Sequence, residues 1–220
     1  MHPVLRLYED VLSSAENVEF RLASLPRFIF VVHGSASIGG KPFTEGEAWQ
    51  GEGATAVKPG KAGVTCWRWE LARGDQGSTV ACAPGMITHE KLSAFLETAP
   101  KGELLMRGDS VAFPPGGCAY THVHQGPGIR CLVEGGIRID THGRSTSYGP
   151  GGAWYESGPD PVFAQAAAGK PSRFIRVMIL PRALIGKSSI QYVNEDDKAK
   201  PKTQSYKIYA DAPVAFEGKK

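Results

Sequence analysis

An internal repeat limits the possible folds of this 220-residue chain more than any other feature. Three segments recur in the same order: 30–38 over 131–139, 46–49 over 151–154, and 67–69 over 175–177. The separation between matched segments grows along the chain, as it would if loops had gained residues between the strands of a duplicated fold. The repeat therefore predicts two copies of one sheet-forming unit.

Short runs of β-branched and aromatic residues, interrupted by glycine and proline, fill both copies. The 27 glycines and 16 prolines make up about a fifth of the chain, against about an eighth in an average protein. Strands are expected at 19–23, 28–33, 54–57, 65–71, 103–113, 120–124, 129–134, 137–140, 162–166 and 173–180. This spacing predicts an all-β fold of antiparallel sandwiches or barrels.

One helix is expected between the two copies. Leu92, Phe95, Leu96 and Ala99 follow the i, i+3, i+4, i+7 spacing of a helix face, and a proline comes directly after them. A weaker pattern of the same kind covers residues 4–11. The first of these segments is expected to link the two copies.

Composition and charge argue against several functions. The net charge is only +3 and the lysines are scattered among acids, which argues against a nucleic-acid surface. Residues 1–12 mix charged with apolar residues, so we expect no export signal, and we expect no membrane span either. A cytoplasmic protein is therefore expected, with reduced cysteines at positions Cys66, Cys82, Cys118 and Cys131.

His122 and His124 are the strongest candidates for a functional site. Residues i and i+2 of a strand project to one face, so both imidazoles could share a cation at the roughly 2.0–2.1 Å of a metal–nitrogen bond. The repeat aligns these positions with Arg21 and Ala23 of the first copy, where no ligand pair exists. Chemistry is therefore expected in the second copy alone.

The surroundings of the histidine pair resemble a known family. Gly117, His122, His124 and Gly135 match the first motif of the cupin superfamily, and the segment 150–158 matches the second. With the repeat, the chain resembles a bicupin with a degenerate N-terminal copy. The resemblance implies double-stranded β-helix (jelly-roll) barrels, and often a divalent transition metal (Fe, Mn, Ni, Zn or Cu) held by three histidines and one glutamate.

The resemblance also implies a domain division. A degenerate N-terminal barrel is expected in 1–86, a helical linker in 87–102, a C-terminal barrel with the site in 103–187, and an extension in 188–220. The alternation of tyrosine, lysine and isoleucine around residues 206–209 indicates that the extension adds an edge strand or wraps the other domain.

The sequence departs from the family's ligand pattern at two positions. The family's glutamate would fall at Gly128, and its third histidine would fall near Pro161 or Val162, so two of four ligands are present. Glu156 of the second motif could supply a third ligand or a general base. It could equally be a strand-edge carboxylate paired with a neighbouring arginine.

Arg130 is a candidate substrate anchor. It follows Gly128 by two residues, so strand alternation points it to the same face, where a guanidinium could hold a substrate carboxylate in a bidentate pair. The alternative is an arginine at the barrel mouth neutralised by Glu156 or Glu134. Arg176, which the repeat aligns with an arginine of the first copy, is expected to form a structural ion pair.

Aromatic residues next to these candidates could line the same pocket. Tyr120 and Trp154 are assigned to substrate binding, and Tyr155 and Phe163 are further candidates. Aromatic residues at alternating strand positions also commonly belong to the core.

These residues predict a metal-dependent enzyme acting on a small anionic molecule. His122 and His124 would be metal ligands, Glu156 a ligand or catalytic base, and Arg130 an anion anchor. The alternative is a non-catalytic binding or sensory protein without a metal, and a third possibility is a structural dimer. A homodimer is expected as the assembly.

Overall fold

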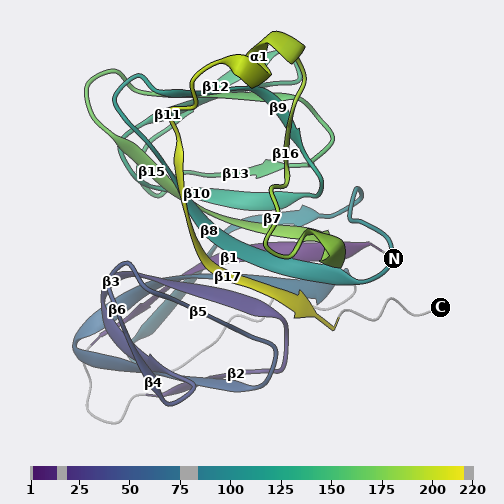
Figure 1. Ribbon diagram of the computed structural model, residues 1–220. Coiled ribbons are helices and arrows are strands. Elements are labelled where there is room, and N and C mark those ends of the chain that lie inside the picture. Colours follow the sequence, from purple (N-terminus) through teal and green to yellow (C-terminus); the bar gives the residue numbers. More distant parts are fainter. Residues whose placement is uncertain (1, 14–18, 75–83, 216–220) are drawn as a thin grey trace. The chain divides into compact units, whose positions relative to one another are not determined.

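The computed structural model describes residues 2–13, 19–74 and 84–215 and is built almost wholly from β-strands (Figure 1). The chain divides into two compact units, unit 1 with Met1–Phe95 and Val214–Lys220, and unit 2 with Leu96–Pro213. No helix in the described ranges is long and apolar enough to cross a membrane.

Unit 1 contains one seven-stranded sheet. Its strands are β1 (Pro3–Leu12), β2 (Phe20–Leu22), β3 (Arg27–Ile38), β4 (Lys41–Thr44), β5 (Ala48–Gly51), β6 (Thr55–Arg73) and β7 (Met86–Phe95). The order is β4-β3-β6-β1-β7, with β2 also paired to β6 and β5 to β3. Ile29 and Ile38, near opposite ends of β3, share one apolar core, so the sheet bends around that core.

The bend in β3 has a local cause at Gly34. The register of β3 against β6 shifts on both sides of this residue. Gly34 has a φ of +79°, and a Cβ atom there would lie 2.3 Å from the Gly63 carbonyl oxygen. Only glycine accepts both this dihedral and this close approach of two backbones.

Unit 2 contains two five-stranded antiparallel sheets that enclose a second core. The strands are β8 (Leu104–Phe113), β9 (Cys118–His124), β10 (Gly128–Glu134), β11 (Ile137–Thr141), β12 (Arg144–Tyr148), β13 (Ala153–Glu156), β14 (Val162–Ala166), β15 (Ser172–Pro181), β16 (Ile190–Tyr192) and β17 (Ser205–Val214). Their orders are β13-β10-β15-β8-β17 and β12-β11-β14-β9-β16. Val111 and Phe174 of the first sheet pack with Ile139 and Val162 of the second, as in a β-sandwich.

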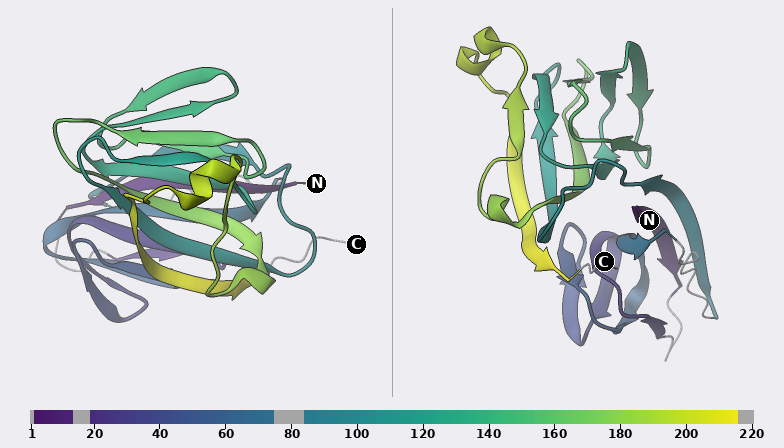
Figure 2. Two further views of the ribbon diagram at one scale, coloured as in Figure 1. Left: turned by 45° about the horizontal axis from the view of Figure 1, so that its top comes forward. Right: turned by 90° about the vertical axis from the view of Figure 1, so that its right-hand side faces the viewer.

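The C-terminal segment adds one strand to each sheet of unit 2. β16 pairs with β9, and β17 is the neighbour of β8, so both are edge strands. The short helix α1 (Glu195–Ala199) lies between them in sequence, and the segment follows one side of unit 2 in the right-hand view of Figure 2. The prediction that the extension adds an edge strand is confirmed.

The strand pairings of the two units use positions that the sequence repeat aligns. At the aligned positions, β3 of unit 1 and β10 of unit 2 each lie between one short and one long strand. The facing residues are Ile29, Trp49 and Arg68 in unit 1, and Arg130, Trp154 and Arg176 in unit 2. The matched sequence segments, whose separation grows along the chain, therefore occupy the same strand-pairing register in both units.

Both expected helices are wrong. The segment 87–95 of the expected helical linker belongs to β7, and the pattern over 4–11 belongs to β1, which pairs with β7 and β6. Ile87 and Phe95 are 70% and 59% exposed, so the apolar residues of β7 do not form a buried helical stripe. Backbone pairing with β1 outweighs the local side-chain pattern here.

The cysteines that can be placed are free thiols. Cys66 and Cys131 are buried, as predicted, and Cys118 is partly buried. Burial raises the pKa of the Cys66 thiol, which makes this residue unreactive. Cys82 lies outside the described residues.

Candidate ligand-binding site

Four predicted site residues meet inside the sandwich of unit 2. His122 and His124 come from β9, Arg130 from β10 and Glu156 from the end of β13, and all four are buried. They line a cavity of about 20 Å³. The prediction that both imidazoles share one face is confirmed, since their ring centroids are 4.8 Å apart.

Both histidines are neutral at physiological pH. His122 Nδ1 lies 2.7 Å from the Tyr120 carbonyl oxygen, and because a carbonyl can only accept, Nδ1 donates and Nε2 keeps its lone pair. Burial lowers the pKa of His122, and burial together with the charges of Arg176 and Arg130 lowers that of His124 well below its usual value. His124 Nδ1 has no hydrogen-bond partner among the described residues.

Arg130 and Glu156 place a charged pair beside the histidines. Arg130 Nη2 lies 2.7 Å from Glu156 Oε2, although the two groups are not aligned as a hydrogen bond. Arg130 Nη1 donates to the Gly128 carbonyl oxygen at 2.7 Å, and Trp154 Nε1 donates to Glu156 Oε1 at 2.8 Å. Burial lowers the pKa of Arg130 to about 10, so the guanidinium stays charged at neutral pH.

The prediction that Arg130 faces the interior is confirmed, and so is its neutralisation by Glu156. The side chain is buried rather than at a barrel mouth, and Glu134 pairs with Arg173 instead, at 2.8 Å. The reading of Glu156 as a carboxylate paired with an arginine therefore describes its contacts. A role as catalytic base stays a prediction.

These residues do not fit the divalent cation that the cupin motif holds. A Cβ atom at Gly128 would lie 2.3 Å from the Val177 carbonyl oxygen, so no ligand side chain can stand there, and the wall at Val162 is apolar. Across the described residues, no three His, Cys, Asp or Glu side chains are placed to hold a metal ion. The nearest candidate for a third ligand is Glu156, whose Oε2 lies 3.5 Å from His124 Nε2 but 2.7 Å from Arg130 Nη2.

The charge of Arg130 adds to this misfit. A divalent ion bound to Glu156 Oε2 at about 2.1 Å would lie within about 5 Å of the guanidinium, whose Nη2 is 2.7 Å from that oxygen. At that distance the doubly charged ion and the singly charged guanidinium repel each other by about 7 kcal/mol, at an effective dielectric constant of about 20. The carboxylate that a metal would need lies directly beside this guanidinium.

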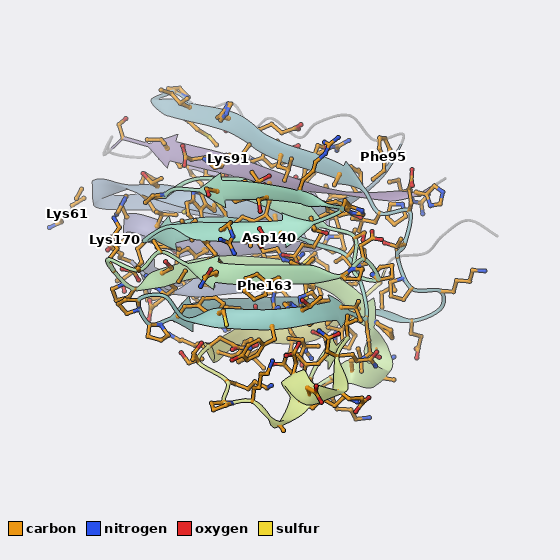
Figure 3. The ribbon with its side chains drawn as sticks, turned by 90° about the horizontal axis from the view of Figure 1, so that it is seen from above. Lys61, Lys91, Phe95, Asp140, Phe163 and Lys170 are labelled. Carbon is orange, nitrogen blue, oxygen red and sulfur yellow. The ribbon has the colours of Figure 1, made fainter. Side chains whose placement is uncertain are left out.

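The aromatic candidates do not line this cavity. The Tyr120 ring lies 4.9 Å from Lys200 Nζ and 5.3 Å from Lys202 Nζ. Trp154 is buried and contributes to the site through its hydrogen bond to Glu156. Phe163 of β14 lies opposite Asp140 of the neighbouring strand β11, on the face seen in Figure 3. The assignment of Tyr120 and Trp154 as substrate contacts in this cavity is therefore not supported by their positions.

A second pair confirms the structural role predicted for Arg176. Its Nε and Nη2 donate to Asp109 Oδ1 and Oδ2 at 2.9 and 2.7 Å. In unit 1, Arg68 holds Asp10 in the same bidentate way at 2.6 and 3.0 Å. Arg176 Nη1 has no hydrogen-bond partner in the described part of the chain.

Sequence reasoning missed a larger pocket on one side of unit 2. It measures about 240 Å³ and is lined by β8, β15, β17 and the loop 186–190. Arg176, Ile190 and Tyr206 line both this outer pocket and the interior cavity, so they form the wall between the two. The alternation in the tail predicted an edge strand, but no local signal placed that strand over the site.

Comparisons with known proteins identify the fold. No protein-family profile and no curated protein matches the sequence. Three similar solved structures are oxalate decarboxylase from Lactobacillus farciminis in a formate complex (TM-score 0.61, 11% identity, 91% of this chain and 82% of that one), a variant of Bacillus subtilis oxalate decarboxylase (0.59, 12%, 89% and 73%), and AerE from Microcystis aeruginosa (0.57, 11%, 82% and 88%).

The fold is the cupin fold. The resemblance predicted from the two motifs is confirmed at this level, together with the nearly all-β architecture. At 11–12% identity the likeness concerns the fold and carries no activity. What the cupin interior of unit 2 can bind must therefore come from its own residues.

Proposed function

We propose that unit 2 binds a small organic anion without a metal ion, as a non-catalytic binding protein. The observation that carries this proposal is the buried guanidinium of Arg130 at the centre of the site, 2.7 Å from Glu156. It supplies a permanent positive charge where a metal-dependent cupin would use a cation. This conclusion favours the metal-free alternative over the metal-dependent enzyme that the histidine pair predicts.

The contacts around Arg130 support exchange of Glu156 for a ligand carboxylate. The Arg130–Glu156 contact is close but poorly directed, so a carboxylate with better alignment can compete for Nη2. Glu156 keeps its hydrogen bond from Trp154 when it yields this position. The interior cavity of about 20 Å³ holds about one water molecule, so it admits only the acid group of a ligand.

We infer that unit 1 is a structural copy without a site of its own. The repeat places Ile29 where unit 2 has Arg130, and Gly51 where it has Glu156. Arg21, which stands at the position of His122, is exposed and paired with Glu19 at 3.0 Å. The buried charges of unit 1 pair with one another, Arg68 with Asp10 and Glu70 and Arg27 with Glu70, beside an apolar core.

A comparison of acids with their neutral amides tests the anion preference. We expect formate, benzoate and hexanoate to raise the melting temperature of the protein more than formamide, benzamide and hexanamide. The preference should correspond to about 1.5–3 kcal/mol, the contribution of a hydrogen bond to a charged group. Equal stabilisation by acids and amides would show that no anion site exists.

A double variant assigns the preference to the interior pair. Arg130→Gln/Glu156→Gln removes both charges together, so neither is left unpaired in the interior. The matched control is Arg138→Gln/Asp140→Asn, which removes an ion pair of 3.1 Å from the surface of the same unit. Loss of the acid preference in the first variant and its retention in the second is the expected result.

A further inference from the structure

We propose that the outer pocket receives the apolar body of the ligand, which makes the ligand a monocarboxylate with an apolar chain or ring. This inference rests on the proposed function and deepens it, because it names the part of the molecule that the interior cannot hold. The outer pocket measures about 240 Å³, slightly below the roughly 300 Å³ at which ligand pockets usually begin. It suits a small molecule.

The two cavities adjoin at the residues that would hold the acid group. Arg176 lines both of them, and its Nε and Nη2 are occupied by Asp109. Arg176 Nη1 can therefore donate a hydrogen bond to a carboxylate at the boundary, from the side of the outer pocket. Arg130 lies on the inner side of the same boundary. A carboxylate placed there meets a positive charge from each strand, β10 and β15.

The outer side of the pocket is apolar and aromatic. Ile190 of β16 and Tyr206 and Ile208 of β17 contribute side chains to it. Tyr206 is positioned by Gln204, whose Nε2 lies 3.2 Å from its hydroxyl oxygen and 3.3 Å from that of Tyr192. Burying such surfaces against a ring or chain contributes about 25 cal/mol for each Å² removed from water.

The loop at the rim of the pocket is held in place before any ligand binds. Arg107 donates to the Leu184 and Lys187 carbonyl oxygens at 2.7 and 2.8 Å and forms an ion pair with Asp211. The Gly186 amide also donates to Asp211, at 2.7 Å. Because β17 supplies Asp211 as well as the pocket wall, the pocket is preformed, which lowers the entropy cost of binding.

Small dicarboxylates fit this arrangement poorly. A second acid group that points toward Ile190, Tyr206 and Ile208 loses water there, and of the other cations in the lining Arg107 is already paired with Asp211, which leaves only Lys187 of the exposed loop. The pocket therefore selects benzoate or hexanoate over oxalate or malonate, and both should bind more tightly than formate, which lacks a body.

Filling the outer pocket tests this placement. Ile208 is 53% exposed, so Ile208→Trp adds volume at the pocket without disturbing the core. Ile87→Trp makes the same change at an exposed position of unit 1 and serves as the control. Binding is measured by calorimetry with formate, benzoate and hexanoate, and circular dichroism checks the fold of each variant.

We expect Ile208→Trp to weaken benzoate and hexanoate at least tenfold and to leave formate within about twofold, with no change in the Ile87→Trp control. If all three acids keep their wild-type affinity in Ile208→Trp, the body does not lie in the outer pocket, although the anion site stands. If oxalate binds as tightly as benzoate, the ligand class is wrong. If no acid binds better than its amide, the proposed function itself has failed.

Discussion

Arg130 and Glu156 show how far single residues determine what the interior can bind. Strand alternation from Gly128 was enough to place Arg130 inside, and the i, i+2 spacing was enough to bring His122 and His124 together. The direct contact between Arg130 and Glu156 joins β10 to β13, two separate segments of the chain. Spacing within one strand contains no information on such a contact.

The two buried histidines predict a loss of stability in mild acid. In the unfolded chain, histidines gain protons below about pH 6.5, whereas burial lowers the pKa of His122 and His124 in the folded protein. The unfolded state then binds more protons, so the free energy of unfolding falls as the pH drops from about 6.5 toward the lowered pKa values. We expect a measurable loss between pH 7 and 5 from this pair, at most about 4 kcal/mol, which is the limit for two histidines that stay neutral in the folded protein.

Urea unfolding at both pH values measures this loss. The variant His122→Gln/His124→Gln should lose less stability than wild type over the same pH interval, because it lacks the two buried imidazoles. The control His33→Gln/His89→Gln changes two exposed histidines and should keep the wild-type dependence. An identical pH dependence in wild type and His122→Gln/His124→Gln would show that the pair is not held neutral.

At the scale of elements, many apolar strands were predictable, whereas the polar strands and the buried strand β1 were not. The expected strands over 103–113 and 162–166 correspond to β8 and β14, whereas β4 and β12 are mostly exposed and lack an alternating apolar pattern. The helical spacing of Leu92 and Phe95 with residues 96 and 99 predicts a helix, whereas the structure has the strand β7 up to Phe95. Only the partner strand β1 decides between them, and that partner lies far away in sequence.

The bend of β3 at Gly34 supplies an element-scale prediction. Gly34→Ala should destabilise unit 1 by at least 2 kcal/mol, because it combines a left-handed dihedral with a Cβ atom 2.3 Å from the Gly63 carbonyl oxygen. Gly40→Ala is the matched control, with a φ of +80° and no atom within 4 Å of its Cβ.

Chemical denaturation should give a loss of about 1 kcal/mol for Gly40→Ala, the cost of the dihedral alone. The difference between the two variants then measures the close approach of β3 to β6. Equal losses in both variants would mean that β3 bends for another reason.

At the scale of the whole molecule, the repeat predicted which strand positions face each other in the two units. It did not predict which side chains fill their interiors. The facing positions on β3, β5 and β6 recur on β10, β13 and β15, as the sequence separations require. The common face of His122 and His124 in the second copy also followed from the sequence. The outer pocket did not follow, because it forms only where β17 returns from the end of the chain to β8.

Metal analysis of the purified protein tests directly whether the site of unit 2 is free of metal. Untagged wild-type protein is incubated with Mn, Fe, Ni, Zn or Cu in turn, desalted, and measured by mass spectrometry for metal per chain. Because Arg130 holds Glu156 and two imidazoles lack a third ligand, we predict less than about 0.1 equivalent of any of these metals. Retention of one equivalent that disappears in His122→Ala/His124→Ala would contradict the account and restore the metal-dependent reading of the site.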